Sequence, residues 1–226
     1  MSSTYPSDAP FAGAYMKLHR AAQFIQELEA ERQRYEASKP YIGRLHERED
    51  SVDVEIAWNG AGLLVGAILG DAVHNIRSAL DLLACELVRM NQKSDNKVSF
   101  PFASEEAKLD EQIINCKFHK AGQAAVDLLR SFAPYRGGND DLRAVHDLDI
   151  QDKHRIIIPF EQTAHATVTA RYNQLRPTDG QVDIDAKVAF LFPDESVLAG
   201  REVIQTLTQM AGLVSSMVDA FKAVAR

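Results

Sequence analysis

A stripe of chemically capable side chains lies along one face of the helix predicted around the segment Gly70–Asp81. At 100° per residue, spacings of three and four place these polar residues on the same face: Asp71, His74, Ser78, Asp81 and Cys85. Asn75 and Arg77 flank the stripe, and Arg77 stands four residues before Asp81, a spacing that favours an ion pair. Carboxylate, imidazole and guanidinium groups on one helix face are suited to proton transfer and to anion binding.

Three interpretations of this stripe are open. In the first it is a structural network, in which Asp71 pairs with His74. Arg77 then pairs with Asp81. In the second, Asp71 and His74 supply two metal ligands from one helical turn. In the third, His74 and Arg77 perform general acid–base or phosphate chemistry. Gly70 in the helix costs about 1 kcal/mol relative to alanine, which predicts a close approach by another backbone.

A second cluster follows near the end of another predicted helix. Ten residues contain two histidines, three aspartates and two cations: His146, Asp147, Asp149, Asp152, Lys153, His154 and Arg155. His146 and Asp149 share a helical face. In one interpretation, the basic residues at the end of the run complement the negative end of a helix dipole. In the other, Asp152, His154 and Arg155 converge on the polar stripe.

The candidate site residues follow from these two clusters. The predicted catalytic groups are His74, Arg77, Asp81 and His154. The predicted binding groups are Asp71, Asn75, Asp152, Lys153 and Arg155. We assign no metal ligands and no cofactor, because a phosphohydrolase pattern drawn through His74, His146, Asp147 and Asp219 has unsuitable spacings. Gly137–Gly138 is an isolated turn rather than a phosphate-binding loop.

Composition narrows the class of protein. The 226 residues carry a formal net charge of -7, so bulk electrostatics give no DNA-binding signal. The two cysteines, Cys85 and Cys116, are not in a paired motif, which argues against a disulfide scaffold and favours a reducing cytoplasm. No uninterrupted apolar stretch approaches the roughly 18 residues of a membrane span. We therefore expect a cytoplasmic protein without membrane segments.

Periodicity indicates the elements that must position both clusters. Helical spacing predicts helices over residues 12–37, 61–90, 104–117, 120–132, 140–148 and 199–225. Alternation or β-branched runs predict strands over residues 52–58, 156–160, 165–172 and 182–192, with a turn at 177–180. The predicted fold class is α+β and predominantly helical: a helical bundle with a small antiparallel sheet. We expect a flexible tail over residues 1–10 and one domain over 11–226, with a β-meander insert at about 154–193.

The motif Gly-Asp-Ala-Val-His-Asn-Ile-Arg-Ser-Ala-Leu-Asp at 70–81 resembles that of a bacterial family without an assigned activity. Phe100-Pro-Phe, Ala133-Pro-Tyr-Arg and Asp152-Lys-His-Arg fit the same family in order, so the resemblance spans about residues 51–160. A more distant likeness is to HEPN-type helical proteins, many of which are RNases with Arg-x(4–6)-His on a helix at a dimer interface. Leu82 stands where the family motif has histidine.

The expected function is a structural or partner-binding helical module with a buried Asp/His/Arg network. The alternative that the HEPN resemblance implies is RNA binding or RNA cleavage, with a homodimer formed through the polar helix face and RNA or protein as the partner. A weaker alternative is a metal-dependent hydrolase.

Overall fold

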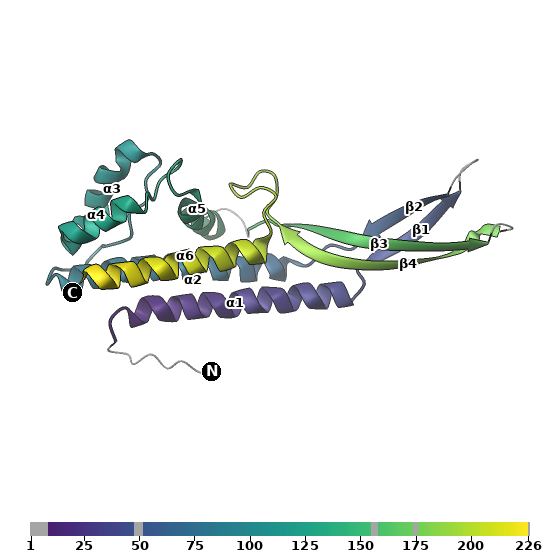
Figure 1. Cartoon of the computed structure of the whole chain (residues 1–226), viewed down its shortest axis with the longest axis horizontal. Helices are drawn as coiled ribbons and strands as arrows, with labels where there is room; N and C mark the ends of the chain where they lie inside the picture. Colours follow the sequence, from purple (N-terminus) through teal and green to yellow (C-terminus); the bar gives the residue numbers. More distant parts are fainter. Residues whose placement is uncertain (1–8, 48–51, 155–157, 174–175, 226) are drawn as a thin grey trace.

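The computed structural model describes residues 9–47, 52–154, 158–173 and 176–225. Three long helices lie side by side: α1 (Ala12–Ala37), α2 (Leu63–Met90) and α6 (Val203–Val224) (Figure 1). Three shorter helices cover one end and side of this layer: α3 (Leu109–Asn115), α4 (Gln123–Ser131) and α5 (Asp140–His154). Single 3₁₀ turns precede α3 and α4, at Glu106–Lys108 and Phe118–Ala121. The predicted predominantly helical α+β class is confirmed.

Two antiparallel hairpins extend from the helices as an arm (Figure 1). The first pairs β1 (Tyr41–Glu47) with β2 (Val52–Trp58), and the second pairs β3 (Glu161–Asn173) with β4 (Arg176–Leu191). The two sheets meet along β1 and β4, where the Tyr41 hydroxyl donates a 2.9 Å hydrogen bond to the Ile184 carbonyl. The arm therefore consists of two separate two-stranded sheets rather than one meander.

Several predictions for the strands and turns of the arm were wrong. Strand β1 escaped prediction because its glycine and charged residues give little alternation, while pairing with β2 supplies its hydrogen bonds. Residues 158–160 are not in a strand, and 156–157 lie outside the described residues. The turn predicted at 177–180 lies within β4, in an irregular stretch where the register shifts between Arg171 and Asn173.

Helix α2 is the central element of the core. Its apolar positions recur around most of its circumference, and side chains such as Leu69, Ile76, Leu80 and Leu83 are fully enclosed by α1, α5 and α6. The helix is long and apolar enough to cross a membrane on length and composition alone, but 67% of its apolar stretch of 18 residues is buried within the fold. Core helices of soluble proteins share this length and composition, so the burial of α2 accounts for its composition.

Gly70 permits α5 to approach α2 closely. The close neighbour is the carboxylate of Asp152, which corrects the expectation of another backbone at this point. A Cβ atom at position 70 would lie only 2.6 Å from Asp152 Cγ, well inside van der Waals contact. The absence of a side chain at Gly70 therefore leaves room for the last turn of α5.

We predict that Gly70→Ala stabilises the fold in one background and not in another. Alanine gains about 1 kcal/mol over glycine in a helix, but in the wild type this gain is lost because the Asp152 carboxylate must move. In an Asp152→Ala background the gain should reappear, as measured by the free energy of unfolding in urea. Gly212→Ala on α6 is the control, because a Cβ there meets nothing within 4 Å. Equal gains for Gly70→Ala in both backgrounds would contradict the packing described.

Candidate functional site

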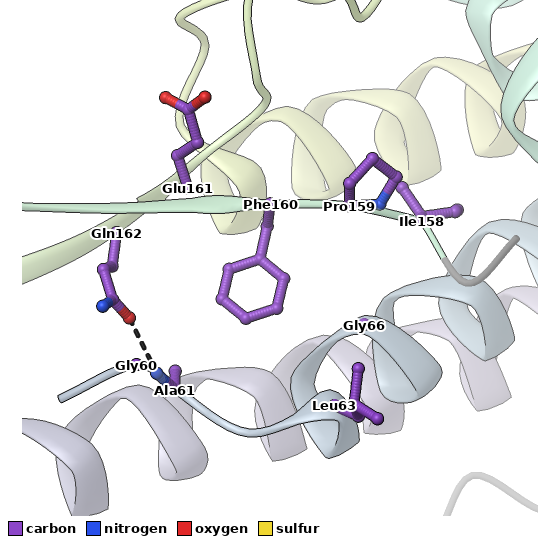
Figure 2. A pocket seen from close by; sticks show the side chains of 9 residues that line it. All are labelled: Gly60, Ala61, Leu63, Gly66, Ile158, Pro159, Phe160, Glu161 and Gln162. Carbon is purple, nitrogen blue, oxygen red and sulfur yellow. Dashed lines mark hydrogen bonds between the residues drawn. The ribbon is translucent and has the colours of Figure 1, made fainter.

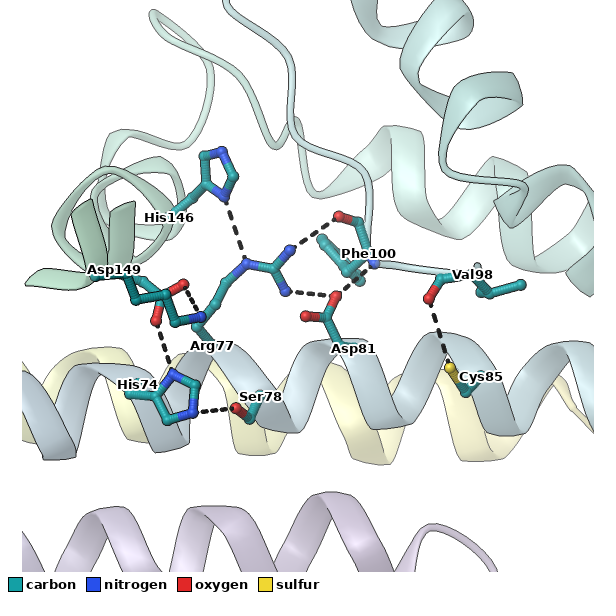
Figure 3. Close-up of polar contacts among 10 residues, drawn as sticks. His74, Arg77, Ser78, Asp81, Cys85, Val98, Phe100, His146 and Asp149 are labelled. Atoms are coloured by element: carbon teal, nitrogen blue, oxygen red, sulfur yellow. Dashed lines mark hydrogen bonds and ion pairs between the residues drawn. The ribbon is translucent and has the colours of Figure 1, made fainter. Parts of the chain in front are cut away.

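The polar stripe of α2 meets α5 and the loop 98–103 at one place (Figure 3). Side chains from α5 bond to the N-terminal part of the stripe, at His74 and Arg77. Backbone groups of the loop bond to its C-terminal part, at Arg77, Asp81 and Cys85. The two clusters singled out in the sequence therefore come together, although not through every residue expected.

Arg77 is the centre of this network. Its Nη1 lies 2.7 Å from Asp81 Oδ1, but no N–H of Nη1 is aligned for a hydrogen bond, so the contact is an ion pair. Nη2 donates to the Phe100 carbonyl and Nε donates to His146 Nδ1, each over 3.4 Å. The guanidinium also lies over the Phe102 ring, 4.9 Å from its centroid. Only 8% of the Arg77 side chain is exposed, so its charge is directed to partners within the chain.

Asp81 joins the helix to the loop. Its Oδ1 contacts Arg77 and also accepts a 2.9 Å hydrogen bond from the Phe100 backbone N–H. One turn further along α2, Cys85 Sγ donates to the Val98 carbonyl over 3.6 Å. These contacts hold the loop along α2. They give Asp81 a positioning role, and its catalytic role stays a prediction.

His74 binds α5 through its imidazole ring. Its Nδ1 lies 3.0 Å from Asp149 Oδ1, and its Nε2 lies 3.3 Å from the Ser78 hydroxyl (Figure 3). Lys153 Nζ donates to the other Asp149 oxygen over 2.8 Å. Asp149 is 6% exposed, whereas 40% of the His74 side chain is exposed. His74 therefore pairs with Asp149, and the expected Asp71–His74 pair is replaced by this contact.

Ser78, His74 and Asp149 stand in the order of a hydroxyl–imidazole–carboxylate relay. Acyl transfer by such a relay also requires N–H donors directed at the oxyanion that forms. Ser78 lies in the interior of α2, where backbone N–H groups bond to carbonyls one turn earlier. The helix around Ser78 thus offers no oxyanion-binding N–H pair, and the arrangement is suited to holding the ring rather than to acyl transfer.

His146 is enclosed between cations and an aromatic ring. It stacks on Phe102, with ring centroids 4.7 Å apart and planes 12° apart. Burial, together with the positive charges of Arg77 and Arg143, lowers the pKa of His146 from 6.5 to about 4. The neutral ring can accept the N–H of Arg77 at Nδ1, which places its own proton on Nε2.

The remaining predicted residues occupy varied positions. Asp152 faces Gly70, and burial and then the negative charges of Asp71 and Asp149 raise its pKa. Asn75 is buried and donates to the Asp71 carbonyl within α2, so it does not face the network. His154 ends α5, but its side chain lies outside the described residues, as does Arg155.

The structure brings in residues that the sequence did not assign to the site. They are Ser78, Phe100, Phe102, His146 and Asp149. The shared helical face of His146 and Asp149 was a usable signal, since both side chains point to α2. Phe100 and Phe102 gave no such signal, because loop residues have no periodicity that fixes their neighbours.

Metal binding has little geometric basis in the part of the chain that the structure describes. No group of three or more His, Cys, Asp or Glu residues is placed to hold an ion there. Asp219, the last member of the phosphohydrolase pattern, lies on α6 and accepts a hydrogen bond from the Tyr15 hydroxyl.

No family model matches the chain, and neither a curated protein nor a solved structure is significantly similar to it.

We predict that His146 makes the fold sensitive to acid. Below pH 6.5 the unfolded chain binds a proton at this ring, whereas the folded chain binds it only near pH 4. Stability from this group is therefore complete above pH 6.5 and decreases as pH falls towards 4, by about 1–2 kcal/mol at pH 5 after allowance for partial exposure. The free energy of unfolding should depend less on pH in His146→Gln than in the wild type.

The control for this experiment is His119→Gln, which changes an exposed histidine. Its stability should follow the wild-type pH dependence between 7.5 and 5. Parallel pH profiles for His146→Gln and the wild type would contradict the assigned role of His146.

Proposed function

We propose that the chain is a structural or partner-binding module, in which the Asp/His/Arg network locks α5 and the loop 98–103 onto α2. One observation carries this proposal: the Arg77 side chain is 8% exposed, and its charged end meets Asp81, Phe100, Phe102 and His146 of the same chain. Buried partners that contact one another in this way stabilise a fold and leave little capacity for a ligand.

The RNA-binding alternative has less support in these contacts. Phosphate binding needs guanidinium N–H groups that reach solvent, and RNA binding in general draws on exposed positive charge. Arg77 would have to leave Asp81 and Phe102 to meet a phosphate, and the whole chain carries a charge of -7. RNA cleavage thus stays a hypothesis to be tested directly, as does metal-dependent hydrolysis.

The outer rim of the network supports the partner-binding part of the proposal. Asp71 is exposed, and 40% of each of the His74 and Asp81 side chains is exposed. Because α5 and the loop already cover Arg77, a protein partner or a second copy of the chain would meet this rim rather than the guanidinium. A homodimer formed through the polar helix face would use these outer groups.

We predict that Arg77→Ala destabilises the fold by about 2–4 kcal/mol, because it removes a buried cation and leaves Asp81, the Phe100 carbonyl and His146 Nδ1 without this partner. Unfolding in urea measures the loss. Arg89→Ala is a matched control on the same helix, since Arg89 also forms a 2.7 Å ion pair with an aspartate but both side chains are largely exposed. That change should cost less than about 1 kcal/mol.

The same proteins distinguish a structural role from RNA chemistry. Wild type, Arg77→Lys and Arg89→Ala are incubated with single-stranded and hairpin RNA, and both gel shift and cleavage are measured. We expect no difference between the three. If the wild type cleaves RNA, and a folded Arg77→Lys variant does not, the structural proposal is wrong. A small and equal loss of stability for Arg77→Ala and Arg89→Ala would also overturn it.

A further inference from the structure

A cavity lies where the arm joins the helices, apart from the polar network. One wall is formed by the segment 60–66, which leads into α2, and the other by the segment 158–162, which leads into β3 (Figure 2). Its volume is about 680 Å³, within the range of roughly 300–1,000 Å³ typical of small-molecule sites. No other chain segment among the described residues fills it.

The cavity is mainly apolar, and one hydrogen bond joins its two walls. Its apolar lining consists of Ala61, Leu63, Ile158, Pro159 and Phe160, and the Phe160 ring extends towards the opposite wall. Ile158 is buried, so on this side the lining continues into the hydrophobic core. Gln162 bridges the walls, because its Oε1 accepts a 2.8 Å hydrogen bond from the Ala61 N–H. This hydrogen bond joins the two walls at one point.

Exposed leucines mark the mouth of the cavity. Leu63 lines it and is 79% exposed, while Leu64, which does not line it, is 57% exposed. Exposed large apolar side chains beside a concave apolar site are a common feature of ligand-binding sites. Leu63 would lose much of its contact with water on binding, which stabilises a complex by about 25 cal/mol for each Å² of apolar surface buried.

The lining also indicates the charge of the ligand. Among the described residues that line the cavity, Glu161 alone carries a charge, and its side chain points away from the side occupied by the Phe160 ring (Figure 2). A buried anion would have no basic partner among these described residues, and burial without a partner is costly. An uncharged ligand avoids this cost.

We propose that this cavity binds an uncharged, mainly apolar small molecule. The site is independent of the Asp/His/Arg network and goes beyond the structural or partner-binding role. A small molecule fits better than a flat protein surface because the site is concave and its volume lies in the range of small-molecule sites. Leu63 is the specificity-determining residue at its mouth.

The test uses the full chain and the neutral dye N-phenyl-1-naphthylamine, whose fluorescence rises in apolar sites. We expect saturable binding that Leu63→Glu weakens at least tenfold, since this change places a carboxylate at the mouth. Leu64→Glu is the matched control: it adds the same charge one residue away, in the same exposed first turn of α2, and should change the dissociation constant less than about twofold.

Competition and self-association complete the experiment. Decan-1-ol should displace the dye at lower concentration than decanoate, and equal competition would overturn the assignment of an uncharged ligand. Absence of saturable dye binding, or equal weakening by Leu63→Glu and Leu64→Glu, would overturn the cavity as the binding site. Sedimentation velocity tests the second-copy alternative: a wild-type dimer that both variants convert to monomer would make this surface an interface and overturn the proposal.

Discussion

The ion pair between Arg77 and Asp81 is the interaction on which the arrangement of the polar site depends. A guanidinium in an apolar core is tolerated where its charge is matched, and the chain surrounds that of Arg77 with Asp81, the Phe100 carbonyl, His146 and the Phe102 ring. Each of these partners fixes a different segment. Because the buried cation requires these partners, it determines how α5 and the loop 98–103 lie on α2.

The neutral state of His146 follows from the same constraint. A second positive charge beside Arg77 and Arg143 would be repelled, and burial adds to that effect, so the ring lies in the site as a hydrogen-bond acceptor. On the adjacent turn of α2 the histidine has a partner of the opposite kind, because His74 contacts the buried carboxylate of Asp149. The two histidines thus perform different tasks: His146 packs against the arginine, and His74 joins the helices near the surface.

Part of this arrangement could be predicted from the sequence. The spacing of Arg77 and Asp81 indicated their pairing, because residues four apart on a helix are neighbours whatever surrounds them. The pairing of His74 with Asp149 depends on how α5 crosses α2, which helical periodicity does not fix. The same limitation applies to the arm: β2 has clear alternation, whereas β1 is a strand because β2 pairs with it.

Because the arm is long, a small change in its angle to the helices moves its far end by a large distance. Strand β3 has 13 residues, which at about 3.3 Å each extend roughly 43 Å from its base. A tilt of about 10° at that base would displace the far end of the strand by roughly 7 Å. Two local contacts, the Gln162–Ala61 and the Tyr41–Ile184 hydrogen bonds, join the arm to its surroundings. Because a small change of angle at the base moves the far end by several ångström, these contacts help to determine the position of residues far from them.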